Sequence, residues 1–473
     1  MTRRSTRLLG LSLTLSLAPA LLAGQSHYGD QAEARALFAE LIGINSTHDH
    51  GATTPAAQAV ARRLRSAGIP ARDVQVVGPN PARMNLVARL RGTGARKPIL
   101  LLAHLDVVEA LRADWSIDPF TLTEKDGFFY GRGTSDIKDM AAIFTTALIH
   151  LKKQGFRPDR DIILALTAGE EGGGDNGVQW LLAHRRDLID AAYCINGDGG
   201  DPLAREGRVY ARDVQASEKV YMDLQLEVHN PGGHSSLPVK DNAIYRLSAA
   251  LTRLGAFQFP ARLNQVTRAY FERASAAEPP ETAKDMGLVA RGDTAAMRRL
   301  SEASPFFNAQ LRTTCVATRL EGGHANNALP QTATAVVNCR MLPDERKEDV
   351  LAALRGAVGD SAVALTVVQE PVPSPPSPLT PEVLQPVERL TAAVWPGAVV
   401  VPSMETGATD GLYLRNAGMP VYGVSGVPLD ADDIRAHGRD ERIRVAAFYA
   451  GLDYMEQLVP ALASDGGHVP AGQ

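Results

Sequence analysis

The order of apolar and polar positions divides the chain into two kinds of segment. Between residues 30 and 213, stretches with helical spacing of apolar residues alternate with short, nearly continuous apolar runs. Runs of that kind are typical of central strands that helices cover on both faces. The pattern predicts helices at 31–42, 54–67 and 138–153, and strands at 97–103, 161–167 and 191–195. This order indicates a doubly wound α/β layer.

After Glu218 the pattern becomes a strict alternation of apolar and polar residues. Residues 220–228 and 333–339 both alternate in this way, as strands with one solvent-exposed face do. A stretch with helical spacing, 242–254, lies between them. The sequence therefore predicts an α+β module inserted into the first domain.

A proline-rich stretch at 371–378 marks the exit from this module, because it suits a stiff, extended linker better than a helix or strand. Beyond it, a strand at 420–424 and a helix at 443–458 return to the α/β pattern. The chain has 473 residues, whereas single hydrophobic cores stop growing at roughly 250–300 residues. We therefore expect a first domain of 24–213 and 371–473, with 214–370 inserted into it.

The first residues have the pattern of an export signal. Three arginines within the first seven residues precede an apolar run at 8–17, and a small-x-small pattern follows at 18–20. The alternative, a membrane anchor, is disfavoured because the run is shorter than the roughly 20 residues that a spanning helix needs. We expect 1–23 to be a signal peptide, with cleavage after Ala20 or Ala23 equally compatible. The mature protein is then periplasmic or secreted, without a stable membrane anchor.

Composition excludes several classes of protein. Lys and Arg total 49 and Asp and Glu total 53, a net charge of −4, which gives no basic surface for nucleic acid. The cysteines, Cys194, Cys315 and Cys339, are widely spaced and form no CxxC pair. That spacing argues against a disulfide scaffold and a cysteine-ligated zinc site. We expect all three to be buried small hydrophobic residues.

Acidic residues and histidines follow three of the predicted strands, at the position where open α/β sheets bind ligands. Taken one at a time, such residues are more often caps or loop residues. Taken together they offer two imidazoles and three carboxylates, a thiolate-free set that suits two divalent ions, zinc first and manganese or cobalt as alternatives. The candidate ligands are His104, Asp136, Glu171, Asp198 and His437. Asp106, two residues after His104, is placed to accept the second N–H of that imidazole.

Five motifs in one order resemble the dizinc metallopeptidases that include glutamate carboxypeptidase, acetylornithine deacetylase, succinyl-diaminopimelate desuccinylase, aminoacylase and carnosinase. The motifs are His104-Leu-Asp106, Gly131-Arg-Gly-Thr-Ser-Asp136, Gly169-Glu170-Glu171-Gly172, the segment around Asp198, and His437-Gly438. The resemblance implies two Zn²⁺ per subunit bridged by Asp136, with Glu170 as general base and Asp106 assisting catalysis. It also implies a cis Asp136–Ile137 peptide bond.

The inserted module carries further parts of the resemblance. His234 within 232–238 and Asn327 within 327–330 would bind the scissile carbonyl, and Arg340 within 340–343 would bind a substrate carboxylate. The alternative interpretations are an ordinary polar turn for His234 and a surface strand end for Arg340. Thr409, within 407–411, resembles a residue of a substrate-contacting loop. Because the lids of relatives pair edge to edge, a homodimer through the lid domain is implied, in which His234 completes the partner's site.

The resemblance thus implies an α/β, doubly wound zinc-peptidase catalytic domain with an inserted α+β lid or dimerisation domain. The implied reaction is hydrolysis of the amide bond of a small peptide or N-acyl amino acid that bears a free carboxylate. Residues 257–308 exceed a compact lid, as in the carboxypeptidase S and Gly-X carboxypeptidase branch, and could cover the lid edge instead. A non-catalytic binding protein is the alternative, and the intact Glu170 disfavours it.

Overall fold

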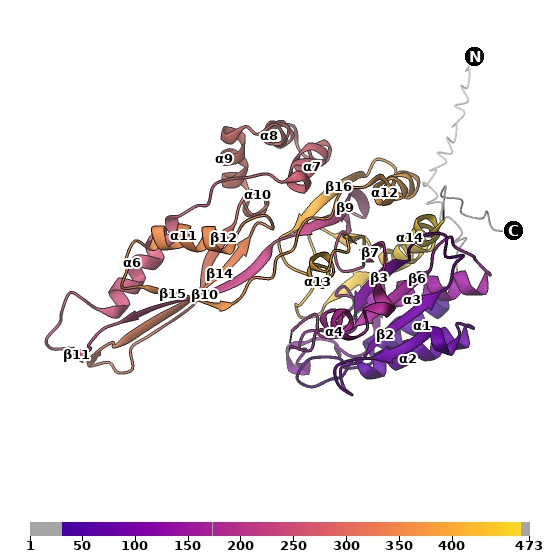
Figure 1. The fold of residues 1–473 in the computed structure, drawn as a ribbon, viewed down its shortest axis with the longest axis horizontal. Helices are drawn as coiled ribbons and strands as arrows, with labels where there is room; N and C mark the ends of the chain where they lie inside the picture. The colour runs from indigo at the N-terminus through magenta and orange to yellow at the C-terminus, as the bar shows by residue number, and fades with distance from the viewer. Residues whose placement is uncertain (1–30, 173, 465–473) are drawn as a thin grey trace, which may run out of the picture.

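Two separate β-sheets organise the protein. The structure is a computed structural model that describes residues 31–172 and 174–464, so the expected signal peptide, 1–23, lies outside the described residues. A ten-stranded sheet occupies one end of an elongated molecule and a four-stranded sheet occupies the other (Figure 1). This confirms the predicted combination of an α/β domain with an inserted α+β module.

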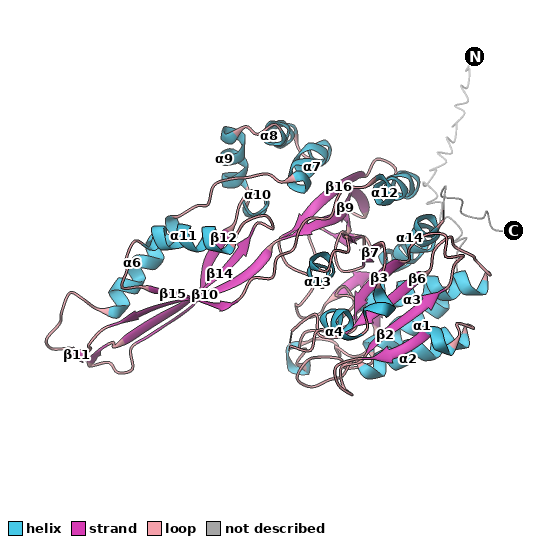
Figure 2. Cartoon of the chain, in the orientation of Figure 1, coloured by secondary structure: helices cyan, strands magenta, loops and turns pink. Residues whose placement is uncertain are grey.

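The centre of the large sheet is formed by three parallel strands, β3 (Ile99–His104), β6 (Ile162–Thr167) and β7 (Tyr193–Asn196). Every residue of these strands is buried, because helices cover both faces of the sheet (Figure 2). Their continuous apolar runs therefore predicted them correctly. The other strands of this sheet are β1 (Val74–Val77), β2 (Asn85–Leu90), β8 (Pro202–Arg205), β9 (Arg208–Glu218), β16 (Val399–Glu405), β17 (Val421–Gly423) and β18 (Leu429–Asp430).

Helix α3 (Lys138–Lys153) lies against the centre of the sheet, with the bounds that its periodicity predicts. It is apolar on nearly all sides because α1 (Gln31–Ile42) and α14 (Val445–Ala463) pack on it as well. The remaining helices of this domain are α2 (Thr54–Ser66), α4 (Gly177–His184), α5 (Arg186–Ile189), α12 (Pro381–Val394) and α13 (Gly411–Asn416). None of the helices within 31–172 and 174–464 has the length and apolar character that a membrane crossing requires.

The small sheet is antiparallel, in the order β12 (Thr314–Gly322), β14 (Thr332–Met341), β10 (Val220–His229), β15 (Ala364–Gln369). Alternate residues of β10 are buried beneath α6 (Ala243–Ala256) and α11 (Lys347–Val358), as the alternation predicts. The opposite face carries the polar positions. Strand β12 forms an edge and is exposed from Val316 onward.

Four helices form the expected helical insertion: α7 (Gln265–Ala274), α8 (Pro280–Ala290), α9 (Thr294–Ala303) and α10 (Pro305–Leu311). Their core includes Val401 of β16, so they pack against the large sheet (Figure 1). They leave the edge of the lid exposed, since Val316 and Leu320 of β12 are 59% and 62% exposed.

The expectation that all three cysteines are simply buried small hydrophobic residues is wrong for two of them. Cys315 of β12 and Cys339 of β14 lie opposite each other in the antiparallel register and form a disulfide. Cys194 is buried and free, as expected. The pairing depends on the register of two strands, which the spacing of cysteines along the chain does not reveal.

Candidate metal centre

The candidate site is a cleft at the carboxyl ends of the central strands. His104 ends β3, Glu170 and Glu171 follow β6, and Asp198 follows β7. Because parallel strands end at the same edge of a sheet, these side chains meet there. The cleft has a volume of about 450 Å³, and Asp136, Asp198, Thr409 and His437 are among the residues that line it.

Two groups of possible metal ligands share His104. One consists of His104, Asp136 and Glu171 and the other of His104, Glu170 and Asp198, with the ligand atoms of each group within 4.8 Å of one another. The structure therefore brings four of the predicted residues, all of them carboxylates, together around the imidazole of His104.

Asp136 lies between the two imidazoles of the site. Its Oδ1 is 3.1 Å from His104 Nε2, and its Oδ2 is 2.9 Å from His437 Nε2. His437 Nε2 is also 3.0 Å from Glu171 Oε2. The expected cis peptide bond between Asp136 and Ile137 is present. A carboxylate that faces a different imidazole with each oxygen has the arrangement of a bridging ligand.

Asp106 supports the centre differently from the prediction. His104 Nδ1 is hydrogen bonded to the backbone carbonyl of Asp106 at 2.9 Å, whereas the nearest carboxylate oxygen is 3.9 Å away. The carboxylate instead accepts the backbone N–H of Glu171 through Oδ2. Its buried Oδ1 has no hydrogen-bond partner among the described residues. Asp106 thus fixes both the imidazole and the loop after β6.

Glu441 is a supporting residue that none of the sequence motifs contains. It is fully buried, forms an ion pair with Arg132 at 2.7 Å, and accepts the backbone N–H groups of Gly133 and Ser135. These bonds hold the loop that presents Asp136. A single glutamate outside every motif gives no signal of this role in the sequence.

The electrostatics of the centre fit divalent cations. Burial raises the pKa of Glu170 well above its usual range, and the charge of Asp198 adds to the effect. Burial likewise raises the pKa of Asp198, although the charge of His104 opposes it. Positive charge placed between such carboxylates stabilises their ionised form. A set of imidazole and carboxylate donors without thiolates suits zinc-like ions.

The lid residues do not reach this cleft. His234, on the two-residue strand β11 (Gly233–His234), lies at the end of the lid farthest from the large sheet (Figure 1). Asn327 precedes β13 (Ala328–Leu329), which pairs with β11, and both side chains are exposed. Arg340, on β14, stacks on the ring of Tyr221 with 4.6 Å between its guanidinium carbon and the ring centre.

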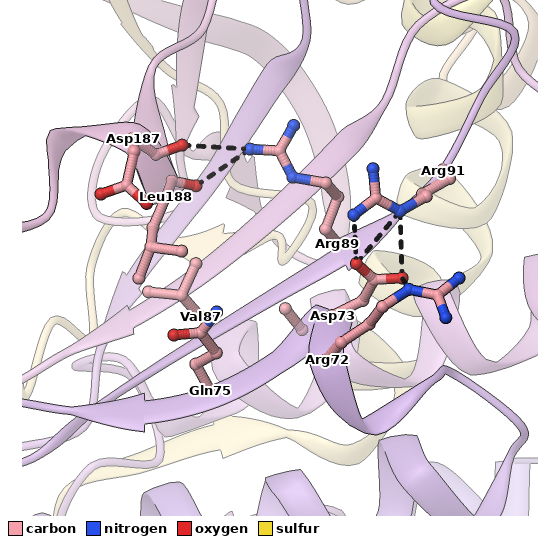
Figure 3. A pocket seen from close by; sticks show the side chains of 9 residues that line it. Arg72, Asp73, Gln75, Val87, Arg89, Arg91, Asp187 and Leu188 are labelled. Atoms are coloured by element: carbon pink, nitrogen blue, oxygen red, sulfur yellow. Dashed lines mark hydrogen bonds and ion pairs between the residues drawn. The ribbon is translucent and has the colours of Figure 1, made fainter.

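A second hollow, at the edge of the large sheet, has no such chemistry (Figure 3). It has a volume of about 320 Å³, and its lining includes Arg72, Arg89 and Arg91. Arg91 donates to the carboxylate of the buried Asp73 through Nε and Nη2. Arg89 donates to Asp161 at 2.9 Å and to the Leu188 carbonyl at 3.3 Å. Because these cations already have partners, we assign the hollow a structural role.

Comparison with known proteins identifies the family. Residues 100–461 match the model of peptidase family M20/M25/M40. The N-fatty-acyl-amino acid synthase/hydrolase PM20D1 of Xenopus tropicalis is 32% identical over 384 residues, which are 76% of this chain and 72% of that protein. The chain belongs to peptidase family M20/M25/M40. The family resemblance found in the sequence is thereby confirmed, and this M20 enzyme is a metal-dependent hydrolase.

Solved structures share the fold of this M20 enzyme. The M20 family metallo-carboxypeptidase Sso-CP2 from Sulfolobus solfataricus matches with a TM-score of 0.67 at 18% identity, covering 91% of this chain and 99% of that one. The Bacillus subtilis YXEP protein, described as a dinuclear metal binding peptidase from the M20 family, matches with a TM-score of 0.57 at 12% identity, covering 92% and 99%. At such identities the likeness shows the fold alone.

Proposed function

We propose that this M20 enzyme hydrolyses the amide bond of N-acyl amino acids or short peptides that carry a free carboxylate. The observation that carries the proposal is the position of Asp136 between His104 and His437, with Glu170 in the same cluster. A protein that only binds peptides has no use for a carboxylate base beside a metal centre. The intact Glu170 therefore favours an enzyme over a binding protein.

Five side chains would hold two cations, for which zinc is the proposed metal and cobalt or manganese also suit the ligands. They are His104, Asp136, Glu171, Asp198 and His437. When bound, such cations supply Lewis acidity, which makes water more acidic and polarises a carbonyl group. Glu170 takes a proton from the attacking water and returns it to the leaving nitrogen. Its burial raises the pKa of its carboxyl, which suits a group that must both take and release a proton.

The walls of the cleft favour an apolar acyl group. Val427, Leu429 and Ile434 line it, and Ile434 stands at the surface, 62% exposed. Aliphatic side chains of this kind bind an aliphatic or aromatic acyl chain. The name of the Xenopus relative, which refers to N-fatty-acyl amino acids, agrees with this preference. Dipeptides are the second candidate, because Asp201 and Glu405 also line the cleft and would attract a free amino group.

The lid would supply the remaining substrate contacts. Arg340 is the proposed partner of the substrate carboxylate, since its planar guanidinium binds both oxygens at once. His234 and Asn327 would donate to the oxyanion that forms at the scissile carbonyl. Thr409 would contact substrate from the floor of the cleft. Because His234 is at the distal end of its own lid, we propose a homodimer through the lid in which it serves the partner's site. The exposed edge of β12 supports such pairing.

Export through a cleaved signal peptide, 1–23, remains part of the proposal. The disulfide between Cys315 and Cys339 supports it, because disulfides persist mainly in oxidising compartments outside the cytosol. Sequencing the N-terminus of the protein from its native host would decide where the mature chain begins.

A substrate panel with controlled metal content tests the function. Metal is removed by chelation and restored as Zn²⁺, Co²⁺ or Mn²⁺, and hydrolysis of N-acyl amino acids of increasing chain length is compared with that of dipeptides. We expect no hydrolysis without metal, recovery with it, and a preference for apolar acyl groups of about tenfold or more over dipeptides. Hydrolysis by a verified metal-free sample would contradict the mechanism, and a preference for dipeptides would select the second candidate.

A further inference from the structure

Glu218 is a fully buried carboxylate at the point where the chain leaves the large sheet for the lid. It is the last residue of β9, and its side chain is completely inaccessible. Its Oε1 accepts Arg415 Nη1 at 2.7 Å and Ser374 Oγ at 2.8 Å. Its Oε2 accepts the backbone N–H and the hydroxyl of Thr409 at 2.9 and 3.0 Å. One carboxylate thus joins segments that are far apart in the sequence.

Both chain crossings between the two sheets meet at this carboxylate. The outgoing crossing is Glu218 and Lys219, and the backbone N–H of Lys219 donates to the carbonyl of Glu405 at 2.9 Å. The return crossing is the proline-rich stretch 371–378, where Ser374 donates to Glu218. Arg415 also donates through Nε to Ser377 Oγ of that stretch, at 3.3 Å. The ion pair between Glu218 and Arg415 therefore holds both crossings to the large sheet.

The third segment, the loop 406–410, is part of the metal cleft. Gly407, Ala408 and Thr409 line the cleft. Thr409 Oγ1 also accepts the side-chain amide of Asn196, the last residue of β7, at 3.3 Å. Glu218 consequently anchors a loop that lines the metal cleft.

We propose that the Glu218–Arg415 ion pair is a positioning element of the site. It sets Thr409 against the metal cleft and couples the position of that loop to the position of the lid. The physical reason is that a carboxylate removed from water holds its donors strongly, and no solvent is available to replace a donor that moves away. A rotation of the lid that displaces either crossing must then shift Thr409 as well. Neither residue touches a metal ligand in the structure, so the role is positioning and not catalysis.

The test compares Glu218→Gln with a matched control, Asp161→Asn, in the full-length protein. Asp161 also pairs with an arginine, Arg89, at 2.9 Å and accepts a backbone N–H, that of Gly92, at 2.8 Å. It precedes β6 and so lies at the end of the sheet opposite the cleft. Both variants lose the negative charge of an ion pair, but only Glu218 is hydrogen bonded to the loop 406–410.

Three measurements decide between positioning and general stability: zinc content, hydrogen–deuterium exchange by mass spectrometry, and the separate effects on KM and kcat. For Glu218→Gln we expect unchanged zinc content and exchange at least tenfold faster in peptides covering 405–411 and 371–378. We expect kcat/KM to fall by about 10-fold to 10²-fold, mainly through KM. Asp161→Asn should leave the exchange of peptides 405–411 and 371–378 unchanged, and it should also leave kcat/KM unchanged.

The exchange measurement stands independently of the proposed function, on which only the kinetic readout rests. If the wild-type protein hydrolyses nothing in the panel, the function fails while exchange in 405–411 still tests the coupling. Should Glu218→Gln fail to fold, Ser374→Ala removes one bond and keeps the ion pair, and faster exchange in both peptides is again expected. Unchanged exchange at 405–411, or an equal kinetic loss in Asp161→Asn, would overturn the proposal.

Discussion

The adjacent residues Glu170 and Glu171 have different neighbours in the metal centre. The backbone N–H of Glu171 is fixed by Asp106, and its carboxylate faces His437 at 3.0 Å. Glu170 instead groups with His104 and Asp198. This separation is consistent with one glutamate as a ligand and its neighbour as the base.

We predict that replacing Glu170 and replacing Glu171 by glutamine have different effects on metal content and on kcat. Glu170→Gln should keep its metal and lose about 10²–10⁴-fold in kcat, because an amide cannot take a proton from water. Glu171→Gln should lose metal, because an amide is a weaker ligand than a carboxylate. Elemental analysis of the purified variants and kcat on the best substrate of the panel measure both effects. Metal loss in Glu170→Gln with metal retained in Glu171→Gln would reverse the two roles.

The clustering of His104, Glu170, Glu171 and Asp198 could be expected from the sequence because each ends or follows a central strand, and Asp136 precedes α3, whereas His437 lies in a turn and only its short motif marks it. The residues that hold the loops of the site in place could not be predicted. Glu441 and Glu218 each act through backbone N–H groups of distant loops, and nothing near them in the sequence marks that contact. Asp106 was found, yet its carboxylate bonds Glu171 and not the imidazole. Hydrogen-bond partners depend on how loops approach, which spacing does not encode.

Among the elements, α3 and β10 were predictable because periodicity reports burial. Helix α3 is buried on nearly all sides and β10 on one side, and both patterns are visible in the sequence. The packing of helices α7 to α10 on β16 was not visible, because it joins segments about 100 residues apart. The disulfide between β12 and β14 was not visible either, because it depends on which residues of the two strands lie opposite each other.

The junction between β9 and β10 gives a prediction about pH. Lys219 is buried there with its Nζ donating to the Arg312 carbonyl at 2.7 Å, and burial lowers its pKa from 10.5 to about 7. Between those two values the unfolded chain binds a proton that the folded chain does not. Raising the pH removes this advantage of the unfolded chain, so the contribution of Lys219 to stability increases from about pH 7 towards pH 10.

A comparison with Lys219→Met isolates this effect, because every other titrating group is common to both proteins. The free energy of unfolding of the wild type, relative to the variant, should rise with pH by at most about 1.4 kcal/mol per unit. Urea unfolding at pH 7, 8 and 9 with equal metal content measures the difference. A difference that does not change with pH would show that Lys219 keeps its ordinary pKa in the folded protein.

The whole molecule is elongated, and this shape separates the two halves of the proposed site. The metal centre lies at the carboxyl ends of strands in the large sheet, whereas β11 lies at the opposite end of the lid (Figure 1). The helical insertion packs on β16 and does not cover Val316 and Leu320 of the lid edge, which are exposed. An edge strand of that kind is free to pair with a second copy.

Subunit mixing tests whether His234 acts on the partner. His234→Ala and Glu170→Gln should each be inactive alone, since one lacks the oxyanion donor and the other lacks the base. In a mixed dimer, the site with an intact Glu170 receives an intact His234 from its partner. Random exchange makes half of the dimers mixed, so we expect about a quarter of wild-type activity. Mixing His234→Ala with the double variant His234→Ala/Glu170→Gln should restore nothing, because no chain then offers the histidine. If native mass spectrometry shows mixed dimers and the first mixture still stays inactive, His234 serves its own chain and the lid must close over its own cleft.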